Sequence, residues 1–88
     1  MKLEDLKSGL EGNTLSYSTI KATELANIMK FAEVKLNIDK ARLDYFYEIY
    51  VDDILNSEMP NDEIETLKNQ GWSFSDDNKK ILLYLKNI

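Results

Sequence analysis

A helix stop followed directly by an alternating pattern constrains this chain more than any other feature. Gly71 can end a helix in the left-handed conformation, and Trp72 would then contact Leu67 as in a Schellman motif. The helix that ends there is expected over residues 62–70, with Asn61 as its N-cap and carboxylates in its first turn. These signals agree with one another, so they predict both ends of this helix.

A β-hairpin is predicted after this glycine. Residues 72–75 and 80–85 alternate in polarity on either side of a polar turn at 76–79. An isolated two-stranded hairpin is marginal in water, so it must pack on helices or gain a third strand. Residues 14–18 alternate in the same way and could supply that strand.

The remainder of the chain is predicted to be helical. The apolar spacing indicates a short helix over 3–10, a second over 19–36 and a third over 40–55. Asn37 is expected at the C-terminal end of the second, and Asp39 is expected as the N-cap of the third. The fold class is therefore α+β, with three to four helices and a C-terminal hairpin in a single domain over all 88 residues.

Acidic residues are concentrated in one part of the sequence. Between Asp44 and Leu67 there are eight carboxylates and no lysine or arginine, whereas the rest of the chain has eight acids and eleven bases. Surfaces that are only solvated normally mix the two signs. Such a sector repels nucleic acid and anionic membranes and attracts basic protein surfaces. The acids of this sector are Asp44, Glu48, Asp52, Asp53, Glu58, Asp62, Glu63 and Glu65.

The expected helix over 40–55 would place part of this sector in a stripe. Asp44, Glu48 and Asp52 follow an i, i+4, i+8 spacing, about 6 Å apart along a helix axis. This spacing is similar to that of phosphates along a nucleic-acid strand. Three interpretations remain open, namely a solvated face, a surface for a basic protein, and a nucleic-acid mimic. The residues predicted to bind a partner are Asp44, Tyr45, Glu48, Ile49, Asp52 and Asp53.

Enzyme chemistry is not expected from this inventory of side chains. The chain has no histidine and no cysteine, which removes the commonest general base, the thiolate nucleophile and the commonest transition-metal ligands. An EF-hand over residues 52–63 is excluded because Ile54 and Ser57 occupy positions that need a ligand and a glycine. We therefore expect no catalytic residue, no metal and no cofactor.

The sequence also bears on location and self-association. The N-terminal residues lack the apolar region of a signal peptide, and the apolar run over 81–85 is too short to cross a bilayer. A cytoplasmic protein without membrane contact is therefore expected. Leu82 and Tyr84 form a second apolar face on the last strand, and they would favour an edge-to-edge homodimer if that strand were exposed.

Residues 61–85 resemble the recognition helix and wing of a winged-helix domain. Together with the predicted preceding helices, the resemblance covers about residues 19–85 and implies a helix–helix–helix–hairpin order. The helix at the position of the recognition helix is acidic, whereas helices that read a DNA groove present basic or amide side chains. The resemblance therefore implies a protein-binding domain in preference to a DNA-binding one.

These observations favour a small, acidic, non-enzymatic binding protein. Its expected partner is a basic protein that handles nucleic acid, and its expected role is that of an inhibitor or regulator of the kind that phages encode. Direct binding of nucleic acid is not expected. The alternatives are a winged-helix-like transcriptional or replication regulator and a self-associating structural protein.

Overall fold

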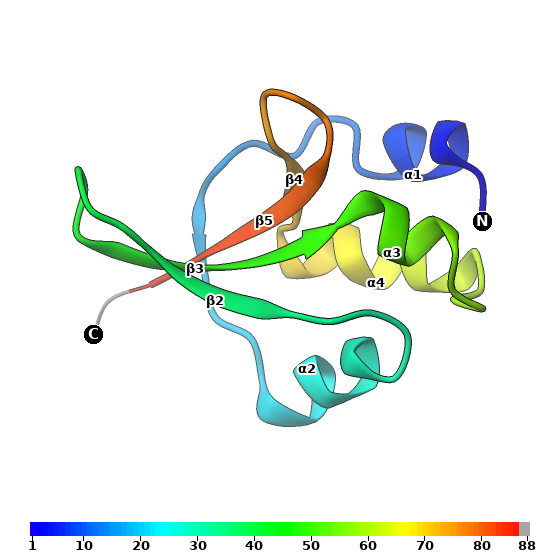
Figure 1. Ribbon diagram of the computed structural model, residues 1–88, viewed down its shortest axis with the longest axis horizontal. Coiled ribbons are helices and arrows are strands. Elements are labelled where there is room, and N and C mark those ends of the chain that lie inside the picture. Colours follow the sequence, from blue (N-terminus) through cyan, green and yellow to red (C-terminus); the bar gives the residue numbers. More distant parts are fainter. Residues whose placement is uncertain (87–88) are drawn as a thin grey trace.

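A five-stranded mixed sheet and four helices make up the described part of the chain. The structure is a computed structural model, and it describes residues 1–86. The predicted α+β class and the C-terminal hairpin are confirmed (Figure 1). The elements are α1 (Leu3–Gly9), β1 (Tyr17–Ser18), α2 (Ala22–Met29), β2 (Lys35–Asp39), β3 (Asp44–Tyr50), α3 (Val51–Leu55), α4 (Asp62–Gln70), β4 (Ser73–Phe74) and β5 (Lys80–Leu85).

The last strand lies in the middle of the sheet. The strand order is β1-β5-β3-β2. β4 pairs with the first half of β5, on the same side as β1, which pairs with the second half. β5 runs antiparallel to β3 and β4 and parallel to β1, with Tyr17 opposite Tyr84. β2 is therefore an edge strand, whereas β5 is paired along both sides.

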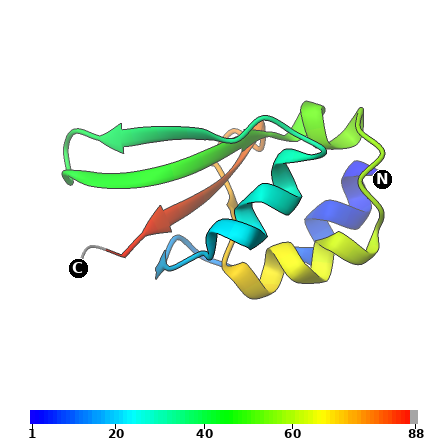
Figure 2. The same cartoon turned by 90° about the horizontal axis from the view of Figure 1, so that it is seen from below.

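The helices cover one face of the sheet and leave the other face open (Figure 2). On the covered face, Ile49 of β3 and both Ile81 and Leu83 of β5 are fully buried. The helices and the segment after α4 complete this core. Their fully buried side chains are Leu6, Ile28, Ile54, Leu67 and Trp72.

The prediction for α4 and the hairpin is confirmed at most positions. Gly71 has a φ of 103°, and the Trp72 N–H donates to the Leu67 carbonyl at 3.2 Å, as the Schellman motif requires. In the hairpin turn, the Ser75 hydroxyl and the Lys79 N–H both donate to Oδ1 of Asp77. These two donors favour the ionised carboxylate and hold the pKa of Asp77 below its usual value.

The predicted helix over 40–55 is wrong. Its residues form a four-residue turn, the strand β3 and the five-residue helix α3. Aromatic and β-branched side chains dominate Asp44–Tyr50, and they favour a strand that can pair on both sides. Because alternate residues of a strand face opposite sides, Asp44 and Glu48 share the open face while Tyr45 and Ile49 face the helices.

Three smaller predictions also need correction. The second helix spans only Ala22–Met29, because residues 35–39 pair with β3 as the strand β2. Asn37 therefore lies within a strand, and Asp39 accepts hydrogen bonds from the Ala41 and Arg42 N–H groups in the hairpin turn. Asn61 makes no side-chain cap on α4. The strand expected over 14–18 is confirmed only as the short β1.

The helix order implied by the winged-helix resemblance is not found in residues 1–86. β2 and β3 stand where the resemblance implies the end of the first helix and most of the second, whereas the helix at the position of the recognition helix is present as α4. The predicted edge-to-edge dimer through Leu82 and Tyr84 required an exposed last strand, and this condition is not met, because β5 has neighbours on both sides. None of the helices within residues 1–86 combines the length and the hydropathy needed to span a membrane.

Candidate functional site

The structure separates the six residues predicted to bind a partner. Asp44 and Glu48 are 7% and 8% exposed on the open face of the sheet, and Ile49 is in the core. Asp52 and Asp53 are exposed on α3, and Tyr45 is exposed on the opposite face of β3. They therefore do not form one stripe.

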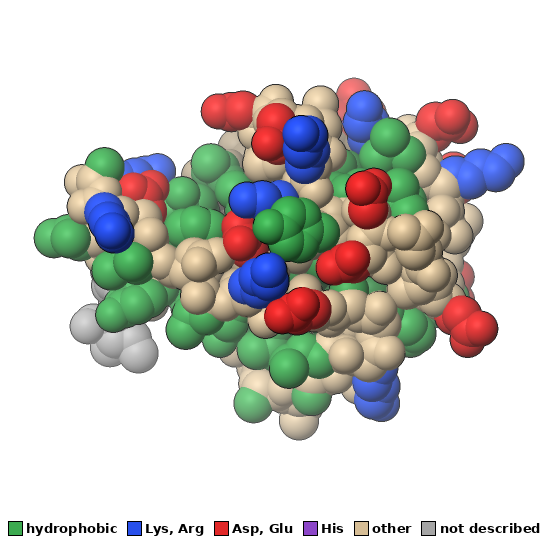
Figure 3. Space-filling view, in the orientation of Figure 1, with side chains coloured by type: hydrophobic (Ala, Val, Ile, Leu, Met, Phe, Trp, Pro, Cys, Tyr) green, Lys and Arg blue, Asp and Glu red, His purple; other side chains and the backbone are tan. Residues whose placement is uncertain are grey.

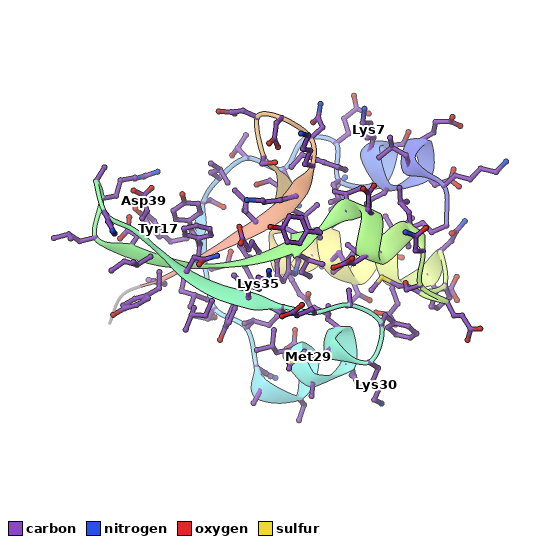
Figure 4. The ribbon with its side chains drawn as sticks, viewed as in Figure 1. Lys7, Tyr17, Met29, Lys30, Lys35 and Asp39 are labelled. Atoms are coloured by element: carbon purple, nitrogen blue, oxygen red, sulfur yellow. The ribbon has the colours of Figure 1, made fainter. Side chains whose placement is uncertain are left out.

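Asp44 is held at one end of the open face by a tyrosine and an arginine. The Tyr17 hydroxyl donates a hydrogen bond to Oδ2 of Asp44, and Nε of Arg42 lies 3.7 Å from the same oxygen. Nη2 of Arg42 also donates to the Tyr17 hydroxyl at 3.1 Å. Figure 4 places Tyr17 beside Asp39 at this end of the sheet. The hydrogen bond to Asp44 favours the neutral phenol and raises the pKa of Tyr17.

Three aromatic rings pack together at the same end of the open face. Tyr84 stacks on Phe46 with ring centroids 5.1 Å apart and meets Tyr17 edge-on at 6.2 Å. The Tyr84 hydroxyl donates to Oδ2 of Asp39 at 3.1 Å, and the Arg42 guanidinium lies 5.5 Å from the Tyr84 ring. Burial, followed by this hydrogen bond, raises the pKa of Tyr84. The cluster is therefore a satisfied polar and aromatic network.

The other end of the open face carries a tyrosine between two lysines. Lys35 Nζ lies 4.9 Å and Lys80 Nζ lies 5.4 Å from the centroid of the Tyr50 ring, distances typical of cation–π contacts. Nζ of Lys80 also lies 3.4 Å from Oε2 of Glu48. Both predicted acids on this face thus have a basic neighbour, which the primary sequence did not reveal.

A different set of acids remains unneutralised. These are the exposed carboxylates of α3, of the loop that follows it and of the start of α4, and we call them together the acidic surface. The two ion pairs within residues 1–86, Arg42–Asp44 and Lys80–Glu48, involve none of its members. Acidic side chains lie over α3 in the space-filling view (Figure 3). The acidic surface consists of Asp52, Asp53, Glu58, Asp62 and Glu65.

A second exposed surface is apolar, and the sequence analysis predicted only one of its residues, Tyr45, to bind a partner. The hairpin of β2 and β3 extends beyond the helices, as Figures 1 and 2 both show. The side chains on the helix-facing side of this hairpin, and the side chain at its tip, are exposed to solvent. The alternation of leucine and isoleucine with polar residues in 35–39 was the signal for this strand. We call these side chains the hairpin surface: Leu36, Ile38, Leu43 and Tyr45, with exposures of 55%, 45%, 72% and 49%.

The described part of the chain offers no candidate metal site. Residues 1–86 contain no group of three or more acidic, histidine or cysteine side chains placed to hold a metal ion. An open hollow of about 500 Å³ between β1, α2 and α4 is lined mainly by hydroxyl and amide side chains.

Comparisons of the chain with protein-family models, with curated proteins and with solved structures found no match. The assignment of function therefore depends on the surfaces described above.

Proposed function

We propose that this protein is a non-enzymatic binding protein that docks the acidic surface on a basic surface of another protein. The observation that carries the proposal is the group of five exposed carboxylates without an ion-pair partner within residues 1–86. A basic, nucleic-acid-handling protein is the partner class with the complementary charge. The chain would act on such a protein as an inhibitor or regulator, as small phage proteins do.

The contrast between the acidic surface and the open sheet face supports this choice. On the open face, Asp44 and Glu48 each have a basic neighbour, so little charge is left for a partner. On α3, Asp52 and Asp53 project into solvent with no base nearby in the sequence. Complementary exposed charge chiefly raises the association rate and makes binding depend on salt.

Tyr50 is the aromatic residue best placed to accompany these acids. It directly precedes α3 and is 39% exposed, whereas Tyr45 lies toward the far end of the same strand. Tyrosines contribute contact area and a hydrogen bond at low cost in side-chain entropy, and they are enriched among residues that dominate binding energy. Asp52 and Asp53 thus replace the helical stripe as the proposed centre of the interface. Tyr50, whose ring lies between Lys35 and Lys80, lies at its edge.

The proposal is tested by a pair of variants with equal changes in charge. One variant carries Asp52→Asn, Asp53→Asn and Glu58→Gln, and the matched control carries Glu4→Gln, Asp5→Asn and Glu11→Gln, which are exposed on and after α1. Each is used to capture proteins from a nuclease-treated lysate of the native host, with elution by rising salt. We expect a basic protein to bind the parent and the control but not the first variant.

Two results would count against the proposal. Equal capture by both variants would show that the acidic surface only solvates the protein. Retention of a partner that is itself acidic would contradict the charge complementarity on which the proposal rests.

A further inference from the structure

The outer edge of β2 is exposed over the three middle residues of the strand. β2 pairs with β3 on one side, and no strand of residues 1–86 lies on its other side. Leu36, Asn37 and Ile38 are all exposed. An edge strand of this kind offers unpaired backbone groups to another strand.

The usual protection of such edges is weak here. Proteins often block an exposed edge with proline, a bulge or an inward-pointing lysine. β2 has no proline, and it pairs with β3 through five consecutive residues without a bulge. Its lysine, Lys35, is positioned over the Tyr50 ring of its own sheet. The edge is therefore open to pairing.

The sequence of β2 is complementary to itself when two copies run antiparallel. A two-fold axis at Asn37 would place Lys35 opposite Asp39 of a second copy, and Leu36 opposite Ile38 of that copy. The strand pleat requires residues that share a face to be opposite each other, and this register satisfies that requirement for all five residues. Opposite charges and paired apolar side chains across strands both stabilise a sheet.

We propose that a second copy of this chain binds at β2, forming a two-fold symmetric dimer with one continuous ten-stranded sheet. The interface is isologous, as is usual for dimers of identical chains. On the open face, Lys35 of each copy lies opposite Asp39 of the other, so the charges on the two sides of the axis are complementary. On the opposite face, Leu36 and Ile38 of both copies join the two hairpin surfaces into one.

The tip of the hairpin extends this interface. Continuing the same register beyond Lys35 brings the tip of one copy next to residues 31–34 of the other, directly after α2. Leu43 at the tip is 72% exposed. Its φ of 57° lies in the left-handed region, which a leucine rarely adopts. Met29, at the end of α2, is 57% exposed (Figure 4). Both side chains lie near this extended part of the interface, so we expect the dimer to cover part of each.

The first test measures mass in solution by sedimentation. The parent is expected at twice the 10.2 kDa of one chain. A variant with Leu36→Lys and Ile38→Lys should be monomeric at the same concentration, because the introduced lysines of the two copies would lie opposite each other and repel. Leu15→Lys, at a residue equally exposed but outside the hairpin surface, should remain dimeric. Circular dichroism checks that each variant is folded. A monomeric parent at millimolar concentration overturns the proposal.

A second test identifies the register. The chain has no cysteine, so a single introduced cysteine reports only on its own surroundings. In Asn37→Cys the two Cα atoms would be about 4.5–5.5 Å apart, within the range that a disulfide spans. In Lys35→Cys they would be about 13 Å apart along the strand direction alone, because four residues at about 3.3 Å each separate them. Oxidation should cross-link the first variant rapidly and the second poorly. Equal cross-linking of the two would contradict the two-fold register.

The dimer and the acidic surface can fail independently. The interface involves β2 and the hairpin tip, whereas the acidic surface belongs to α3 and the start of α4. The variant of Asp52, Asp53 and Glu58 should therefore keep the dimeric mass while losing its basic partner.

Discussion

Gly9 and Ile64 lie so close together that a Cβ atom on Gly9 would fall 1.9 Å from Cγ2 of Ile64. This contact joins the end of α1 to the buried side of α4. Gly9→Ala should therefore destabilise the fold by about 1–3 kcal/mol through overpacking, although alanine favours a helix by about 1 kcal/mol over glycine. Denaturant unfolding followed by the fluorescence of Trp72, the single tryptophan, measures the change.

A second substitution shows whether the contact is the cause. In an Ile64→Ala background the clashing methyl group is absent, so Gly9→Ala should cost less than in the parent. Gly12→Ala is a useful comparison, since nothing lies within 4 Å of a Cβ there and only its φ of +90° opposes alanine. Equal costs of Gly9→Ala in both Ile64 backgrounds would exclude the steric explanation.

Gln70 is predicted to stabilise the core through the indole of Trp72. Nε1 of Trp72 donates to Oε1 of Gln70 at 2.9 Å, and Nε2 of Gln70 donates to Oε2 of Glu24 at 3.2 Å. Gln70→Leu leaves the buried indole N–H unpaired and should cost about 1–3 kcal/mol of unfolding free energy. Asn69→Leu makes the same change at an exposed neighbour and should have little effect. If the two variants unfold at the same denaturant concentration, the buried hydrogen bond contributes nothing.

Ser73→Ala is expected to stabilise the protein. Oγ of Ser73 is buried and has no hydrogen-bond partner within residues 1–86, so alanine removes a desolvated polar atom worth about 1 kcal/mol. Ser75→Ala should act in the opposite direction, because its hydroxyl donates to Asp77 at 2.6 Å and accepts from the Lys80 N–H at 3.2 Å. Thermal unfolding of the two variants should therefore shift to opposite sides of the parent.

Tyr17 and Tyr84 should ionise late in an alkaline titration. The folded state favours their neutral phenols, so both pKa values are raised above the ordinary tyrosine value of 10.0. Their contribution to stability is present below the unfolded pKa and is lost as the pH rises through the folded pKa. Ultraviolet difference absorbance follows the formation of the phenolates. Asp44→Asn should lower the pKa of Tyr17, so that this tyrosine ionises at a lower pH. An unchanged titration of that variant would exclude Asp44 as the main cause.

Local signals were enough to predict α4 and the hairpin from the sequence. Gly71, Trp72 and Leu67 lie within six residues, so one short motif determines the helix end. The turn at 76–79 likewise depends on neighbours in the sequence. Such features require no knowledge of distant partners.

The strand β3 could not be separated from a helix by apolar spacing alone. Its aromatic residues fit an arc of a helix as well as two faces of a strand. Composition was the better guide, because five of the seven residues in Asp44–Tyr50 are aromatic or β-branched. Giving that preference more weight than the periodicity would have favoured the strand.

The neutralisation of Asp44 and Glu48 depends on the sheet register. Glu48 lies beside Lys80 only because β3 pairs with β5, which is remote in the sequence. The absence of bases between Asp44 and Leu67 therefore said little about the surroundings of these two acids. It was informative for Asp52 and Asp53, whose helix extends away from the sheet.

The central position of β5 determines when this chain can fold during translation. β5 is synthesised after β1, β3 and β4, the strands with which it pairs. Until it leaves the ribosome, β3 lacks one neighbour and β1 lacks its only one. The nascent chain must therefore keep the apolar face of β3 exposed, and contact with chaperones or misassembly is most probable in this interval.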